Sequence, residues 1–287
     1  MTKLNRQLNF HLITSKTFWY GAPLVISEII KRNHYISCFD EKNIPENETL
    51  LDCDVFMDMS TITDESFYIS LEKTLSKKTS RGKKVPLMID PPEAILNSVD
   101  KRKTHDIFPD LVPKSYNLNG KNNLNAINKF FSDKYVVVKP AVGWWAKCVE
   151  RITPKQALIK YEKSKDVIIQ KYIPFEEGVG RIVTINYNDD FEIACSYLRK
   201  PKSWRTGVDI KYKCIKQPID DNLYSFAKQI SQRCGLYLNG IDYIYSNGKY
   251  ILIEINAVPA MKEPYDEFKI DIPNKLINHI ERNIIVE

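Results

Sequence analysis

Long apolar runs are absent from this sequence of 287 residues. The longest ones, such as residues 135–138 and 251–253, are far shorter than the roughly 20 residues that cross a bilayer. Residues 1–9 carry positive charge, but neither an apolar stretch nor a small-residue cleavage site follows them, so we expect no signal peptide. We therefore expect no membrane partner, and the cytoplasm is the expected location.

Paired metal-binding or redox motifs are also missing. No C-x-x-C pair, of the kind that clamps zinc or performs redox chemistry, occurs among the six cysteines, which are Cys38, Cys53, Cys148, Cys195, Cys214 and Cys234. No metal-binding spacing occurs among the four histidines, which are His11, His34, His105 and His279. We expect reduced, mostly buried thiols and structural or surface histidines.

Two familiar nucleotide-binding motifs are absent as well. No G-x-x-x-x-G-K-[ST] segment occurs, and Gly178 and Gly180 lack the third glycine of the dinucleotide fingerprint. The residues after Gly180 are β-branched and predict a strand, whereas that fingerprint requires a helix. An enzyme that transfers hydride is therefore disfavoured.

The composition is that of a folded chain with a modest positive charge. Hydrophobic residues make up 43%, which is enough to bury a substantial core in two or three packed lobes and excludes a disordered chain. The net charge of +6 comes from 42 basic against 36 acidic residues. This surplus suits nucleic acid or an anionic substrate such as a nucleotide, and charge alone does not choose between them.

The first ninety residues have the pattern of a small α/β lobe. Apolar runs at 8–13, 55–59 and 85–89 predict strands, and residues 23–32 predict a helix. Two prolines follow at 91 and 92, where they lack amide donors and interrupt regular structure. We place a domain boundary there, and the predicted domains are 1–93, 94–166 and 167–287.

Strands rich in Val, Ile and Tyr dominate from residue 135 onward. They are predicted at 135–139, 167–170, 181–187, 192–198 and 250–255. Helices are predicted at 154–163 and 222–234, the second with Asp221 as its candidate cap and Gly235 as its candidate stop. The chain therefore has the pattern of an α/β (α+β) protein, without internal repeats or a long linker.

The most informative segment is a predicted hairpin. Asn247-Gly248 is a strong turn signal, so the runs on either side should pair as antiparallel strands. Asp242 and Glu254 then lie at the same end of the hairpin, and Glu254 and Asn256 project from one face. Three convergent oxygen-bearing groups suit Mg²⁺. A solvated hairpin edge with ordinary acids is the alternative.

A lysine ends the apolar run 136–138. Lys139 is costly at the end of a buried strand unless it meets an anion. The turn that follows contains Gly143, Trp144, Trp145 and Lys147, and its backbone amides suit phosphates. Strands often end in lysine and proline, and two indoles also suit a core, so each signal is weak alone.

A basic loop interleaves cations with an aromatic residue. Its residues are Arg199, Lys200, Lys202, Trp204 and Arg205. The loop favours a substrate carboxylate, with single-stranded nucleic acid, an acidic peptide or a solvated loop as alternatives.

Taken in order, these segments resemble the ATP-grasp superfamily, specifically its branch containing the ribosomal-protein glutamate ligases and the carrier-protein ligases of lysine biosynthesis. The likeness runs from about residue 85 to residue 259. It is carried by residues 86–95 leading to Asp100 and Lys101, residues 138–140 with Gly143, Trp144 and Trp145, residues 169–173, Arg181, Arg199, Asp242, Glu254 and Asn256. No single one of these segments is specific to the superfamily, but their occurrence in this order is.

The resemblance implies a three-lobed fold, in which an N-terminal Rossmann-like lobe joins two α+β lobes that clamp ATP. The residues expected to bind the nucleotide are Lys101, Lys139, Gly143, Trp145, Gln170, Lys171, Tyr172, Ile173 and Glu177. Among these, Glu177 is a candidate for the ribose hydroxyls, and a solvated acid is its alternative. The expected ligands of Mg²⁺, or of Mn²⁺ as an alternative, are Asp242, Glu254 and Asn256, and Arg181 and Arg199 are expected to steady the transferred phosphoryl group and the acyl phosphate.

The implied activity is an ATP-dependent carboxylate–amine ligase that forms an amide or peptide bond and releases ADP. An amino acid such as glutamate would be added to an amine-bearing small molecule, peptide or carrier protein. The alternatives are a dipeptide or D-alanine-type ligase and, more distantly, a non-catalytic nucleotide- or nucleic-acid-binding module. We expect no nucleic-acid partner, and a homo-oligomer is an open option.

The sequence departs from the family pattern at four positions. Lys171 replaces an acid, Gly207 stands where many members have an asparagine, and Val258 and Ala260 replace Ser and Gly. The last three lie in segments that commonly line the substrate site, so the nucleotide site is expected to be the better preserved of the two.

Overall fold

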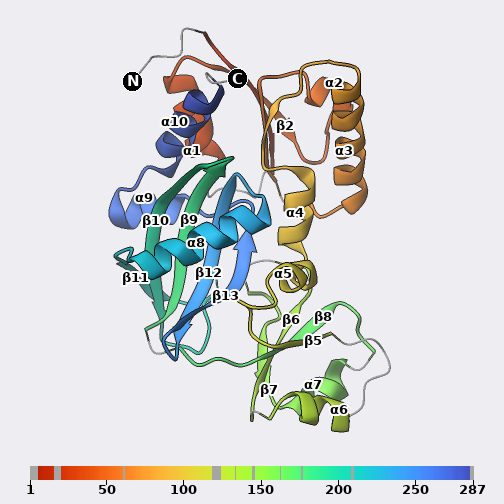
Figure 1. Ribbon diagram of the computed structural model, residues 1–287, viewed down its shortest axis with the longest axis vertical. Helices are drawn as coiled ribbons and strands as arrows, with labels where there is room; N and C mark the ends of the chain where they lie inside the picture. Colours follow the sequence, from red (N-terminus) through yellow and green to blue (C-terminus); the bar gives the residue numbers. More distant parts are fainter. Residues whose placement is uncertain are drawn as a thin grey trace.

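The structure is a computed structural model that describes residues 6–15, 21–60, 62–117, 124–132, 134–143, 146–161, 163–175, 177–207 and 210–284. Its strands form three separate sheets, one in each of three lobes (Figure 1). In Figure 1 the C-terminal sheet lies between the N-terminal lobe and the middle lobe. None of the described helices combines the length and the apolar character needed to cross a membrane.

The N-terminal lobe is a parallel sheet in the order β2-β1-β3-β4. Its strands are β1 (Asn9–Thr14), β2 (Tyr35–Asp40), β3 (Val55–Met59) and β4 (Leu87–Ile89), and its helices are α1 (Ala22–Lys31), α2 (Asn47–Leu50) and α3 (Glu65–Ser80). β3 is buried along its whole length, as expected of a central strand with helices on both faces. The expected Rossmann-like lobe is confirmed.

The middle lobe begins where two prolines prevent β4 from continuing. It contains α4 (Pro92–Val99), α5 (Lys101–Ile107), α6 (Leu124–Phe130) and α7 (Pro154–Tyr161), and the strands β5 (Ser115–Asn117), β6 (Val136–Pro140), β7 (Glu150–Ile152) and β8 (Val167–Lys171). The antiparallel order is β5-β8-β6-β7. The boundary predicted between 166 and 167 is therefore wrong, because β8 pairs with β5 and β6.

The C-terminal lobe is an antiparallel sheet in the order β11-β10-β9-β12-β13. Its elements are β9 (Val179–Tyr187), β10 (Asp190–Pro201), β11 (Tyr212–Lys216), α8 (Asp221–Cys234), β12 (Leu238–Ser246), β13 (Lys249–Asn256), α9 (Lys262–Phe268) and α10 (Ile272–Ile284). Asn247 and Gly248 connect β12 to β13 with φ of 51° and 76°, so the predicted hairpin is confirmed.

Two local predictions in this lobe need correction. Asp220, not Asp221, caps α8, because its side chain accepts the hydrogen bond from the Leu223 amide. Arg199 does not end its strand but lies within β10, which continues to Pro201 because its last residues pair with β11. Gly235 ends α8 in the left-handed conformation, as predicted.

The N-terminal and C-terminal lobes share one hydrophobic core. It joins Phe10 of β1 and Ile29 of α1 to Ile185 of β9 and Ile277 of α10. The middle sheet, with α6 and α7, has a separate core around Ile127, Val138, Ala157 and Ile169, whereas α4 and α5 pack against the C-terminal lobe. The site described next lies where the middle sheet faces the C-terminal sheet.

Candidate active site

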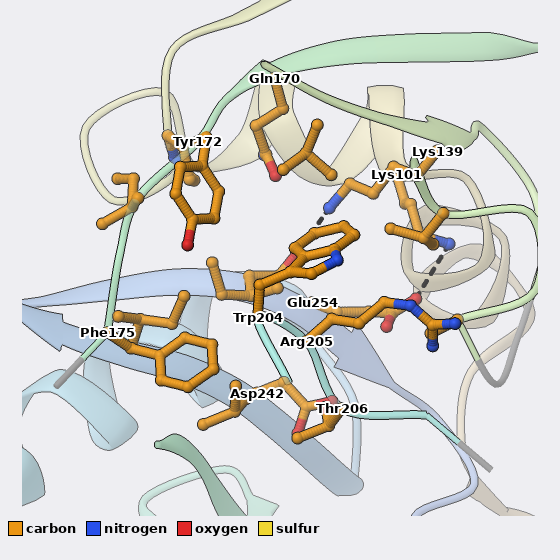
Figure 2. Close-up of a pocket in the computed structure, with 18 of the residues that line it drawn as sticks. Lys101, Lys139, Gln170, Tyr172, Phe175, Trp204, Arg205, Thr206, Asp242 and Glu254 are labelled. Atoms are coloured by element: carbon orange, nitrogen blue, oxygen red, sulfur yellow. Dashed lines mark hydrogen bonds and ion pairs between the residues drawn. The ribbon is translucent and has the colours of Figure 1, made fainter. Parts of the chain in front are cut away.

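A cavity lies between the middle sheet and the C-terminal sheet (Figure 2). The middle lobe contributes Lys139 from β6 and Gln170 from β8, and the C-terminal lobe contributes Asp242 from β12 and Glu254 from β13. The structure therefore brings together groups that are more than a hundred residues apart in the sequence.

Two buried lysines lie in this cavity. The Lys101 ammonium forms an ion pair with Glu254 Oε1 at 2.9 Å and donates to the Gly143 carbonyl at 2.8 Å. Lys139 is 5% exposed, and its Nζ donates to the backbone carbonyl of Ile253 at 3.3 Å. Burial and, to a smaller extent, the nearby Lys101 lower the pKa of Lys139 to about 8, against the attraction of Glu254 and Asp242. An anion held between the two ammonium groups would relieve this unfavourable electrostatic environment.

The hairpin register places the two carboxylates opposite each other. Asp242 pairs with Glu254 across β12 and β13 and with Arg181 across β12 and β9. Arg181 Nη2 donates to Asp242 Oδ2 at 2.7 Å, and Arg199 Nη2 donates to Asp242 Oδ1 at 2.6 Å. Burial alone would raise the pKa of Asp242, but the two guanidinium groups outweigh it and lower the pKa. Asp242 is thus held as a carboxylate.

The arginine pair also faces a second, larger cavity. Its volume is about 630 Å³, and it is lined by Arg181 and Arg199 as well as by Glu254, Asn256 and residues of the N-terminal lobe. Arg199 is 9% exposed, and its buried Nε has no hydrogen-bond partner among the described atoms. A buried donor of this kind is costly unless a ligand accepts from it.

Asp242, Glu254 and Asn256 have the chemistry of a magnesium site. They offer hard oxygen donors at one end of the hairpin, and Asn256 Nδ2 donates to the Gly240 carbonyl at 3.2 Å, which leaves its amide oxygen as an acceptor. In this structure the carboxylates are neutralised by Arg181, Arg199 and Lys101. No group of three His, Cys, Asp or Glu side chains with metal-binding geometry occurs in the described part of the chain.

The segment after β6 contains the predicted glycine turn. Gly143 lines both cavities and has φ of 153°, a conformation that residues with a side chain rarely adopt. Trp145, predicted to bind the nucleotide with Gly143, lies outside the described residues, as does Trp144.

The predicted adenine segment forms one wall of the first cavity. Gln170, Lys171, Tyr172 and Ile173 all line it, whereas Glu177 is exposed and lies outside its lining. Gln170 is 3% exposed, and its Nε2 lies 3.1 Å from His105 Nε2. Its side-chain orientation is therefore set by α5, the helix that also positions Lys101.

His105 is a neighbour that sequence reasoning did not connect to the site. Burial, together with the positive charges of Lys139 and Lys101, lowers its pKa to about 4. A neutral imidazole can accept the hydrogen bond from Gln170, which an imidazolium could not. No local motif marks His105, because only the docking of α5 against β8 brings the two side chains together.

Part of the basic loop also lies in the first cavity, which the sequence did not predict. Trp204, Arg205 and Thr206 line it, and Figure 2 shows the Trp204 indole among Lys101, Gln170 and Glu254. The guanidinium of Arg151, on β7, lies 5.0 Å from the centre of the Tyr172 ring and 5.3 Å from that of Trp204. This stack joins the middle lobe to the C-terminal lobe beside the cavity.

Comparison with known proteins identifies the same fold and family. The profile of the RimK-like ATP-grasp domain matches residues 119–280, more than half of the chain. The alpha-aminoadipate–LysW ligase LysX of Saccharolobus solfataricus is 26% identical over 44% of this chain and 49% of its own. The coenzyme gamma-F420-2:alpha-L-glutamate ligase of Methanococcus maripaludis is also 26% identical, over 61% of this chain and 64% of its own. The chain thus aligns with about half to two thirds of the length of these relatives.

A solved structure of the ATP-grasp ligase PsnB, complexed with a phosphomimetic variant of its minimal precursor, Mg and ADP, covers 96% of this chain and 98% of its own, with a TM-score of 0.69 and 15% identity. At this sequence identity the structural similarity shows a shared fold, and the similarity extends over all three lobes. The matching profile and the three-lobed architecture together show that this chain belongs to the RimK-like ATP-grasp family.

Proposed function

We propose that this chain is an ATP- and Mg²⁺-dependent ligase that joins a carboxylate to an amine through an acyl phosphate. The observation that carries the proposal is the junction of the two cavities. Lys101, Lys139, Asp242 and Glu254 line the first, and the second begins at Asp242 and Glu254 and adds the Arg181–Arg199 pair. A nucleotide in the first cavity would thus present its terminal phosphate to a substrate in the second.

The nucleotide would be held by both lobes. Lys101 and Lys139 would neutralise its phosphates beside the turn at Gly143, and Trp145 remains a candidate for nucleotide binding. Adenine would lie against the wall formed by Gln170, Lys171, Tyr172 and Ile173, and Glu177 remains a candidate for the ribose hydroxyls. The burial of the Lys139 ammonium and its proximity to Lys101 support the phosphate role.

Asp242, Glu254 and Asn256 would hold Mg²⁺, with Mn²⁺ as an alternative. When bound, the metal neutralises phosphate oxygens and orients the phosphoryl group for transfer. The PsnB structure that contains Mg and ADP supports Mg²⁺ as the metal. The arginines and Lys101 neutralise the acids in this structure. With the metal bound, they would donate some of their hydrogen bonds to phosphate and acyl oxygens instead.

In the first step, a carboxylate oxygen of the substrate attacks the γ-phosphorus of ATP, the bond to the β-phosphate oxygen breaks, and ADP leaves. In the second step, the amine nitrogen attacks the acyl carbon, phosphate leaves and the nitrogen loses a proton. Arg199 and Arg181 would stabilise the negative charge of both steps, and the Arg199 Nε has no competing partner among the described groups.

For the substrates, we propose an amino acid such as glutamate, joined to an amine-bearing small molecule, peptide or carrier protein. The two relatives are by name ligases of an amino acid with LysW or with coenzyme F420, which supports this class. We also assign the reaction to the cytoplasm, since none of the six cysteines forms a disulfide.

The proposal is tested by incubating the purified protein with MgATP, hydroxylamine and a panel of amino acids and simple carboxylic acids. We expect ADP and a hydroxamate in equal amounts with at least one acid. Release of AMP and pyrophosphate instead would mean adenylation and would contradict the acyl phosphate.

A further inference from the structure

The second cavity has arginine side chains on one side and a buried acid on the other. The C-terminal lobe contributes Arg181 and Arg199, and the N-terminal lobe contributes Asp58, Ser60 and Tyr68. Asp58 lies near the carboxyl end of β3, at the edge of a parallel sheet where ligands commonly bind. A volume of about 630 Å³ is typical of a small-molecule site.

Asp58 is buried, and all of its hydrogen-bond donors are neutral. It is 6% exposed, and it accepts from the Tyr68 hydroxyl at 2.8 Å and from the Ser60 amide at 2.9 Å. An ionised carboxylate has about four acceptor positions, so these two bonds orient the group and leave acceptor positions for a ligand. The Ser60 amide binds Oδ1 and the Tyr68 hydroxyl binds Oδ2, so each carboxylate oxygen keeps a further acceptor position.

The other described acids of this cavity have cationic neighbours. Asp242 pairs with the two arginines and Glu254 with Lys101. Glu263 accepts from the Tyr197 hydroxyl at 2.6 Å and interacts with the charge of Arg181. No ion pair to Asp58 is found among the described residues.

The electrostatics of Asp58 favour a cationic ligand. Burial raises the pKa of its carboxyl, and repulsion from Glu41 raises it further, despite the hydrogen bonds from Ser60 and Tyr68. A cation beside this carboxylate would reverse the effect and keep it ionised. The N-terminal wall is therefore suited to a positive group, just as the opposite wall is suited to an anion.

We infer that Asp58 is a substrate-binding residue that receives a primary ammonium group in the second cavity, while the arginine pair receives the carboxylate or acyl phosphate. This inference rests on the proposed function and narrows its substrate class to molecules that carry an ammonium group. The ammonium belongs either to the carboxylate donor, as in a zwitterionic amino acid, or to the amine-bearing acceptor.

The test compares acids that differ only in their ammonium group, such as L-glutamate with glutarate and L-alanine with propionate, in the hydroxylamine assay with MgATP. Hydroxylamine replaces the acceptor, so this arm reports on the donor alone. In a second arm, L-lysine, L-ornithine and propylamine replace hydroxylamine. The proteins are wild type, Asp58→Asn, Asp58→Ala and, as the matched control, Asp90→Asn. Asp90 is a buried acid at the end of the neighbouring strand that lines neither cavity.

If the donor carries the ammonium group, Asp58→Asn should lose the preference of wild type for an amino acid over its deaminated partner by at least about tenfold in kcat/KM. If the acceptor carries it, KM for the amine should rise by at least about tenfold while the donor arm is unchanged. In both cases the KM for ATP and the Asp90→Asn protein should stay within about twofold of wild type.

Unchanged preferences and unchanged KM values in both arms, in folded Asp58→Asn and Asp58→Ala proteins that still form product, would overturn the inference and leave the ligase intact. Absence of ADP and hydroxamate with every acid, in wild type as well, would instead reject the proposed function, and the inference with it.

Discussion

Lys139 shows at the residue scale how a binding group differs from a stabilising one. Its ammonium is buried, its pKa is lowered to about 8, and it has a backbone carbonyl as its hydrogen-bond partner. Such a group gives the folded chain little in the absence of an anion. We expect Lys139 to contribute to the affinity for ATP, through the phosphate that it binds.

Lys139→Met is therefore expected to weaken ATP binding by about 10- to 100-fold, while the free energy of unfolding of the ligand-free protein does not fall. Calorimetry and urea unfolding measure the two quantities. Lys160→Met on the exposed face of α7 is the control, and it should change neither. Unchanged ATP affinity in Lys139→Met would remove the phosphate role.

Asp90 is a buried acid outside both cavities, and its contribution to the free energy of unfolding should depend on pH. Its Oδ1 accepts from the Leu238 amide at 2.8 Å, and burial raises its pKa to about 8. In the unfolded chain it titrates near pH 4, so between about pH 4 and pH 8 unfolding releases a proton. This group therefore lowers the free energy of unfolding as the pH rises through that window.

Asp90→Asn keeps an acceptor for the Leu238 amide but does not titrate. The free energy of unfolding of the variant, relative to wild type, should therefore increase from pH 5 to pH 8, by at most about 1.4 kcal/mol per pH unit. Urea unfolding at pH 5, 6.5 and 8 tests this. A difference that is constant with pH would show that Asp90 titrates normally in the folded chain.

At the scale of elements, the close packing of β9 on β12 sets the position of the acid and arginine groups. A Cβ at Gly180 would lie 2.1 Å from Cζ of Tyr243, the residue after Asp242. Gly180→Ala is expected to displace β12 and to lower the free energy of unfolding by about 1–3 kcal/mol, with a loss of activity.

Gly21→Ala is the matched control for this substitution, because its Cβ would meet the flexible end of Met59 at 2.9 Å. It should cost less than Gly180→Ala in the same urea unfolding experiment. Equal costs would show that the contact between β9 and β12 is not the cause.

The elements also show what could be predicted from the sequence. Asn247-Gly248 made the hairpin predictable and placed Asp242 and Glu254 at the same end of it. Their direct pairing was not predictable, because it depends on a register shift between Asp242 and Tyr243. The β-propensity of 167–170 predicts a strand but not its sheet, and pairing with β5 and β6 placed β8 in the middle lobe. His105 and Asp58 reach the two cavities only through contacts between elements distant in sequence, and no local pattern marks them. The basic-loop pattern marked Trp204, but it did not predict its place in the first cavity.

At the scale of the whole molecule, the candidate nucleotide site spans lobes with separate cores. A ligand that contacts both lobes binds the folded chain and not the unfolded one. Mg²⁺ with a non-hydrolysable ATP analogue at 100 times its Kd is therefore expected to stabilise the protein by about 2.7 kcal/mol.

Removal of the metal with EDTA should reduce this stabilisation, because the phosphates would then face Asp242 and Glu254 without a bridging cation. Thermal unfolding with and without the chelator measures the effect. An identical shift in both conditions would contradict a metal site formed by these acids.

The central claim is that a substrate carboxylate is phosphorylated by ATP at the junction of the two cavities. Transfer of ¹⁸O tests it most directly: the acid that gives ADP in the panel is labelled in its carboxylate and incubated with MgATP and hydroxylamine, and the products are analysed by mass spectrometry. An acyl phosphate predicts one ¹⁸O atom in each inorganic phosphate released and none in the nucleotide. Label in AMP, or unlabelled phosphate with full product formation, would contradict the account.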